Sequence, residues 1–127
     1  MALGSAYVPG VCNIGPIEIA MRRRAGHLAL GLTLGLWVVL GYIGVSSVMR
    51  FWLAIPATIT AVCYLQAYMH FCANFGLRGV FNFSPALNRT DTVSQAAYRQ
   101  KDRLKALQIL GISILIGVSV GLLAFWL

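Results

Sequence analysis

Acidic residues are scarce in this chain of 127 residues, which has three Asp and Glu residues against ten Lys and Arg. The three acids are Glu18, Asp91 and Asp102, and none lies inside a long apolar segment. Pumps and ion-coupled transporters normally place a carboxylate within the membrane to relay protons or to bind cations. The scarcity of acids therefore argues against that class of function.

Charge of either sign is also scarce. Only 10% of the residues are charged and 59% are hydrophobic, whereas a soluble domain carries about 25% charged residues. Segments 25–49, 51–77 and 106–127 are long apolar runs, and the first two are separated only by Arg50. Each run exceeds the roughly 18 to 20 residues that a helix needs to cross the hydrocarbon core. Runs of this length are too long to be the strands of a membrane barrel. We therefore predict an all-α integral membrane protein of one domain with three transmembrane helices.

The predicted boundaries follow from the charged and turn-forming residues. A cytoplasmic or interfacial arm is expected at 1–24, and membrane helices are expected at 27–47, 51–75 and 106–127, with a cytoplasmic loop and helix start at 76–105.

Local sequence signals predict two further features, one before the first membrane helix and one before the third. Segment 17–24 is predicted to form a short interfacial helix, because Ile17 and Met21 share one face. Thr92 and Gln95 fit a capping box that starts a helix continuing into the third crossing.

Basic residues predict the orientation. After two crossings the N-terminus and segment 76–105 lie on one side, which carries every Lys and Arg except Arg50. Basic loops stay in the cytoplasm, so we expect the N-terminus inside and the C-terminus outside. The net charge of +7 also favours contact with anionic lipids. Nucleic-acid binding is not predicted, because the basic residues border membrane helices.

Motifs for self-contained catalysis are missing from the sequence. It has no Walker loop, no dinucleotide fingerprint and no CxxC pair among Cys12, Cys63 and Cys72. We therefore expect a protein that is not an enzyme, with no soluble small-molecule substrate and no metal centre of cysteines.

Two histidines are candidates for cofactor binding. His27 and His70 are predicted to lie at similar depth near the cytoplasmic side, each on the small-residue face of its helix. Neutral imidazole is a common metal ligand, so these residues could hold a haem or a chlorophyll-type pigment. The alternative is that both are interfacial histidines bonded to backbone or lipid head groups.

The stretch "YMHFCANFGLRG" places Cys72 between His70 and Arg78. Arg78 nearby would favour a reactive thiolate and a redox role. The alternative is ordinary packing in a turn where the second helix leaves the membrane.

Small residues recur at four-residue spacing on two of the predicted helices. Gly31 and Gly35 form a GxxxG pair, and Ser113, Gly117 and Gly121 form a second stripe. Such faces let membrane helices approach closely. Basic and aromatic residues at the predicted membrane surfaces are expected to anchor the chain to head groups. These anchors are Arg22, Arg23, Arg24, Arg78, Trp52 and Trp126.

Two segments carry a resemblance to a known family. "CNIGPIEIAMRRRAGHLALGL" and "CANFGLRGVFNF" resemble the opening and the closing segment of the YgaP-type small inner-membrane domain, over roughly residues 12–82. The matching residues are Asn13, Gly15, Glu18, Arg22, Arg24, Gly26, Cys72, Phe75 and Gly79. Ala73 stands where the family has proline, and the third helix is additional to the family's two. The resemblance implies a bacterial inner-membrane hairpin, related in some members to sulfur chemistry, and no particular activity.

These observations favour a non-catalytic accessory subunit of a larger respiratory or photosynthetic membrane complex, whose partners are other membrane subunits and anionic lipids. A pigment-binding subunit using His27 or His70, and a sulfur-linked or redox protein using Cys72, are the alternatives.

Overall fold

The computed structural model describes residues 7–83 and 90–126. In these ranges the chain forms α1 (Pro16–Ile43), α2 (Ser47–Phe51), α3 (Ala54–Met69), α4 (Ala73–Arg78), β1 (Val80–Phe81), β2 (Asp91–Thr92) and α5 (Ala96–Trp126). α1, α2 together with α3, and α5 are each long and apolar enough to cross a membrane. The prediction of an all-α fold with three membrane helices is confirmed, and the chain is a multi-pass membrane protein.

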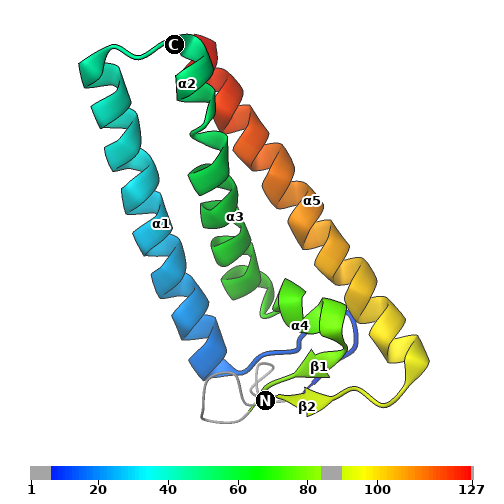
Figure 1. Cartoon of the computed structure of the whole chain (residues 1–127). Coiled ribbons are helices and arrows are strands. Elements are labelled where there is room, and N and C mark those ends of the chain that lie inside the picture. Colours follow the sequence, from blue (N-terminus) through cyan, green and yellow to red (C-terminus); the bar gives the residue numbers. More distant parts are fainter. Residues whose placement is uncertain (1–6, 84–89, 127) are drawn as a thin grey trace.

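The second crossing lies between the other two (Figure 1). α3 packs against α1 on one side and against α5 on the other, and α2 packs against α5. The arm (residues 7–15), α4 and the antiparallel β1–β2 pair gather at one end of the molecule, which we call the arm end. This small hairpin was not predicted, because strands of two residues leave no alternation to detect.

α1 is longer at its start, and shorter at its end, than the predicted helix 27–47. It begins at Pro16, the first helical position, where the missing N–H of proline costs nothing. The separate interfacial helix predicted at 17–24 is therefore wrong, since those residues are the first turns of α1. The helix ends at Ile43 because Gly44 takes a left-handed conformation with φ of 68°.

The second crossing is interrupted at both of its predicted ends. α2 stops at Phe51 and α3 runs only to Met69, so the second crossing spans Ser47–Met69 and the predicted bounds of 51–75 are wrong. His70 ends α3 in a left-handed conformation with φ of 56°. Gln66 supports the turn that follows, because its side-chain Oε1 accepts a hydrogen bond of 2.8 Å from the N–H of Ala73 at the start of α4.

α5 runs without a break from the arm end to the far end of the molecule, as the sequence predicts. Its start differs from the prediction: Thr92 lies in β2, and Gln95 accepts the first helical hydrogen bond from Arg99 N–H at 3.1 Å. The helix has 31 residues, about 46 Å at 1.5 Å per residue. That exceeds the hydrocarbon thickness of about 30 Å, so its basic first turns extend beyond the apolar layer.

Small residues of α5 form the contact between α5 and the second crossing. Ser113 is fully buried, and a methyl group added to Gly117 would overlap Thr58 Oγ1 and lie 2.8 Å from the carbonyl oxygen of Ala54. A methyl group on Gly121 would lie 2.9 Å from the carbonyl oxygen of Phe51. This stripe is used within the chain.

The GxxxG pair of α1 has a different environment. Gly31 and Gly35 have no described atom within 4 Å of an added methyl group. In the described structure, the last buried residue of α1 is Thr33. The last ten residues of α1, 34–43, therefore have no buried side chain among the described residues.

Candidate functional site

A buried polar cluster forms where the arm crosses the turn between α3 and α4. Its members come from the arm, α1, the α3–α4 turn and the residue after β1, and each is at most 8% exposed. They are Asn13, Glu18, Arg22, Cys72 and Asn82. All five lie within the two segments that carry the family resemblance, and all but Asn82 are among its matching residues. The fold therefore brings those two segments together.

An ion pair on α1 forms the centre of the cluster. Glu18 and Arg22 are four residues apart, which places them on the same face of the helix. Glu18 Oε1 accepts from Arg22 Nη1, and Glu18 Oε2 accepts a hydrogen bond of 2.7 Å from Asn82 Nδ2. A buried ion pair is tolerated when further hydrogen bonds satisfy its charged groups, and Asn82 supplies one.

Cys72 lies directly against the guanidinium of Arg22. Arg22 Nη2 donates to Cys72 Sγ at 2.9 Å, and the guanidinium carbon lies 5.4 Å from the centre of the Phe75 ring. The sequence predicted Arg78 as the neighbour of this thiol, but Arg78 instead lies over the same Phe75 ring at 5.5 Å. Cys72 is 2% exposed, and the redox hypothesis for it stays a prediction.

Asn13 fixes the backbone at Cys72. Its Oδ1 accepts from Cys72 N–H at 2.7 Å and its Nδ2 donates to the Cys72 carbonyl at 3.1 Å. Asn13 N–H also donates to the carbonyl of His70, and Asn82 N–H donates to the carbonyl of Asn13. One asparagine thus holds the arm, the turn and the segment after β1 together.

A groove of about 430 Å³ opens beside this cluster. Arg22, Gln66, Cys72 and Asn74 give it polar groups, and Arg22 Nε has no hydrogen-bond partner among the described residues. The remaining lining is mostly apolar and comes from α1, α3, α4 and α5.

The two histidines lie in different settings. His27 Nδ1 is 2.7 Å from Tyr64 Oη, and the two rings meet edge to face. His70 is the turn residue after α3, so the expectation that it lies on a helix face is wrong. In the described ranges, no group of three His, Cys, Asp or Glu residues could hold a metal ion. The hypothesis of a haem or pigment on His27 or His70 stays a prediction.

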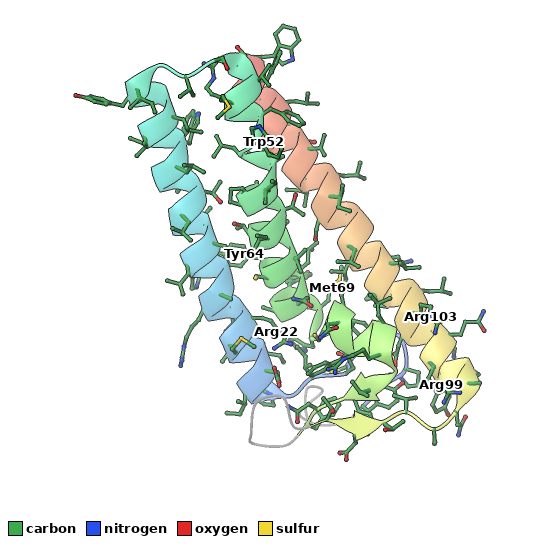
Figure 2. The ribbon with its side chains drawn as sticks, in the orientation of Figure 1. Arg22, Trp52, Tyr64, Met69, Arg99 and Arg103 are labelled. Carbon is green, nitrogen blue, oxygen red and sulfur yellow. The ribbon has the colours of Figure 1, made fainter. Side chains whose placement is uncertain are left out.

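Most of the expected head-group anchors are exposed. Arg23, Arg24, Arg78, Trp52 and Trp126 are all exposed. Figure 2 shows Trp52 toward the end of the molecule opposite the arm end. Arg22 is the exception, since it is 8% exposed and paired with Glu18. Arg22 is therefore not on the exposed surface with the other anchors, and its contact with head groups stays a prediction.

A second set of contacts ties the arm to α5. Asp102 is fully buried, and its carboxylate accepts from Tyr7 Oη at 2.6 Å and from Gly10 N–H at 2.7 Å. Burial and the hydrogen bond to Asp102 raise the pKa of the Tyr7 hydroxyl well above its usual range. Burial likewise raises the pKa of the Cys12 thiol.

Sequence reasoning did not find several of these residues. The four-residue spacing of Glu18 and Arg22 was an available signal for their pairing. Asn82 and Tyr7 gave no signal, because their partners lie 64 and 95 residues away in the chain.

Comparison with known proteins does not assign the chain to a family. A scan against protein-family models and searches of curated proteins and of solved structures found no match. The resemblance to the YgaP-type domain therefore stays a prediction.

Proposed function

We propose that this protein is a non-catalytic accessory subunit of a larger complex in the bacterial cytoplasmic membrane. Its N-terminus lies in the cytoplasm, and α1 is the helix that contacts a partner subunit. The polar cluster is then a structural clasp that fixes the arm against the α3–α4 turn. The complex is of the respiratory or photosynthetic kind.

The observation that carries this proposal is the position of Gly31 and Gly35. Gly31 lies two residues after the buried Ala29, and Gly35 lies two residues after the buried Thr33. Two residues correspond to about 200° around a helix. The GxxxG face of α1 therefore points away from α3. The comparable stripe on α5 is filled by α2 and α3.

The physical reason concerns helix association in lipid. Lipid tails are as apolar as leucine, so membrane helices associate through close packing, which small residues permit. A face of two glycines four residues apart gives little packing to lipid and much to another helix. The exposed GxxxG face therefore fits the surface of a partner helix.

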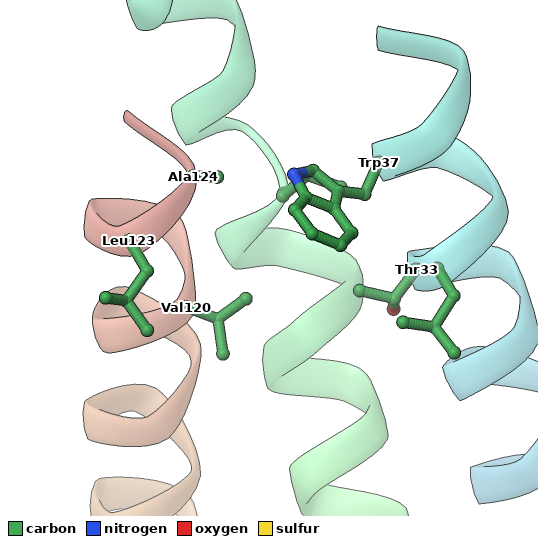
Figure 3. Close-up of a pocket in the computed structure, with 7 residues that line it drawn as sticks. Thr33, Trp37, Val120, Leu123 and Ala124 are labelled. Carbon is green, nitrogen blue, oxygen red and sulfur yellow. The ribbon is translucent and has the colours of Figure 1, made fainter. Parts of the chain in front are cut away.

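The gap between α1 and α5 supports the same proposal. Two apolar cavities of about 240 and 450 Å³ lie between these helices, over α3. Figure 3 shows the smaller one, into which Trp37 projects from α1 opposite Val120 and Leu123 of α5. Among the described elements α1 packs chiefly against α3, as expected for a helix with a second neighbour in a complex.

The test is extraction of the native membranes in mild detergent, followed by native gel separation and mass spectrometry of whatever migrates with the chain. Gly31→Leu and Gly35→Leu are expected to lower the recovery of the partner about tenfold, because overpacking a helix contact costs about 1 to 3 kcal/mol.

Gly111→Leu is the matched control. Gly111 is an open glycine with nothing described within 4 Å of an added methyl group, and it lies on α5. It follows the buried Ile109 by two residues, so it also points away from its own helix contacts. Migration of the wild-type chain alone, or equal partner recovery for Gly31→Leu and Gly111→Leu, would refute the proposal.

A further inference from the structure

We propose that the groove beside Arg22 is a binding site for an anionic amphiphile of the membrane leaflet at the arm end. The ligand class is a molecule with one phosphate or carboxylate head group and at least one acyl chain. This inference does not depend on the accessory-subunit proposal, because it concerns a different surface of the chain.

The unpartnered donor of Arg22 is the first reason. Its Nη1 donates to Glu18 and its Nη2 donates to Cys72 Sγ, while Nε has no partner among the described residues. A buried donor without a partner costs about 1 to 3 kcal/mol. An anionic oxygen is the strongest partner for a guanidinium N–H. Arg22 is one of the residues that line the groove, and its Nε is buried behind that lining. Figure 2 shows Arg22 on the side of α1 that faces the other helices.

The charge around the groove is favourable for an anion. Glu18 is the acid of the cluster, and both of its oxygens already accept hydrogen bonds, from Arg22 and from Asn82. Arg78 lies over the Phe75 ring that Arg22 also contacts, and it is exposed. Among the described residues, Arg78 therefore adds one positive charge beyond that of the Glu18–Arg22 ion pair.

The distribution of polarity along the groove indicates an amphiphile and not a free ion. The polar lining residues Arg22, Gln66, Cys72 and Asn74 all come from the part of the groove nearer the arm end, where Met21, Ala73 and Leu77 also line it. Ala25 and Val62 lie one turn further along α1 and α3, away from the arm end, and Leu110 of α5 completes this apolar part. A groove whose polar groups are confined to one end, and whose other end is apolar, matches a head group with its chain.

The size of the groove agrees with this ligand class. Its volume of about 430 Å³ lies within the range of about 300 to 1,000 Å³ that is usual for small-molecule sites. It holds a head group with part of one chain, while the rest of the ligand remains in the bilayer.

The experiment measures which amphiphiles stay bound to the full-length protein. Protein is reconstituted in nanodiscs of phosphatidylcholine, of phosphatidylcholine with phosphatidylglycerol, and of phosphatidylcholine with oleate, and bound molecules are counted by native mass spectrometry. One anionic molecule per chain is expected to be retained at least about tenfold over phosphatidylcholine, as for one charge-assisted hydrogen bond.

Two variants test the two ends of the groove. Arg22→Lys keeps a cation for Glu18 but removes the Nε donor, with Arg23→Lys, an exposed neighbour, as its control. Val62→Phe fills the apolar part, with Ile59→Phe, an exposed residue of the same helix, as its control. Val62→Phe leaves the polar cluster untouched, so the test remains decisive if Arg22→Lys fails to fold.

Loss of the retained anion in Arg22→Lys or Val62→Phe, but not in the controls, supports the site. Retention of phosphatidylglycerol alone assigns the ligand as a phospholipid, and retention of oleate alone assigns it as a fatty acid. Equal retention of anionic and zwitterionic lipids, or an equal loss in the variants and in their controls, would overturn the proposal.

Discussion

Replacing single glycines with alanine gives a direct test of how the three helices pack. Gly117 and Gly31 are both helical glycines of membrane-crossing helices. Alanine is favoured over glycine in a helix by about 0.5 to 1 kcal/mol, chiefly for reasons of backbone entropy. This gain is common to both sites, so the difference between the two variants reports the surroundings of the added methyl group.

The structure gives opposite surroundings for the two methyl groups. At Gly117 the methyl would overlap Thr58 Oγ1, which donates a hydrogen bond of 2.6 Å to the carbonyl of Ala54. Thr58 can turn away only by losing that bond, and the Ala54 carbonyl, 2.8 Å from the methyl, is backbone that moves only if the helices separate. Overpacking of this kind costs about 1 to 3 kcal/mol. At Gly31 the methyl meets no described atom within 4 Å.

Gly117→Ala is therefore expected to be less stable than Gly31→Ala by about 1 to 3 kcal/mol. The assay is reversible unfolding in mixed micelles with increasing SDS, followed by helical circular dichroism. Gly121→Ala should behave as Gly117→Ala does, and Gly35→Ala as Gly31→Ala does. A difference below about 0.5 kcal/mol, the usual spread for surface substitutions, would refute the packing of α5 against α3 described above.

Two further predictions concern the ends of the molecule. Arg50→Gln should lower the free energy of unfolding by about 1 to 3 kcal/mol. The reason is that Arg50 donates to the carbonyl of Ala124 at 2.9 Å and to the carbonyls of Val45 and Phe125. Equal SDS midpoints for Arg50→Gln and wild type would contradict this prediction. The bond from Tyr7 to Asp102 raises the pKa of Tyr7 in the folded state, so its stabilisation is complete below the unfolded value of about 10 and is lost as the pH rises above it. Limited proteolysis of the arm should therefore accelerate above about pH 10 in wild type, and Tyr7→Phe should remove that pH dependence.

The sequence alone predicted the elements that depend on local composition. Long runs without charge can be placed only in lipid, so the three crossings and the unbroken course of α5 could be derived without a structure. Helix ends were harder, because they depend on single residues. Gly44 ends α1 in a way that the hydrophobic pattern does not reveal, and His70 adopts a left-handed turn that is uncommon for a residue with a side chain.

The polar cluster shows how far the sequence reaches toward the site. Asn13, Glu18, Arg22 and Cys72 were all marked by the resemblance, but nothing in it said that they touch. Arg22 and Cys72 are 50 positions apart in the chain, and Asn13 and Cys72 are 59 positions apart. Such contacts exist only once α1 and α3 have packed and the arm has folded back over their ends.

The two small-residue stripes show most clearly which features the sequence determines and which the tertiary structure decides. Their four-residue spacing is a property of the sequence, and it determined that each helix has a face able to approach another closely. Which face is filled was decided by the tertiary structure, because α5 presents Gly117 and Gly121 to the second crossing while α1 turns Gly31 and Gly35 away from it. The physical reason is that helical periodicity fixes the relative positions of side chains around one axis, whereas the rotation of each helix about that axis is set by what it packs against.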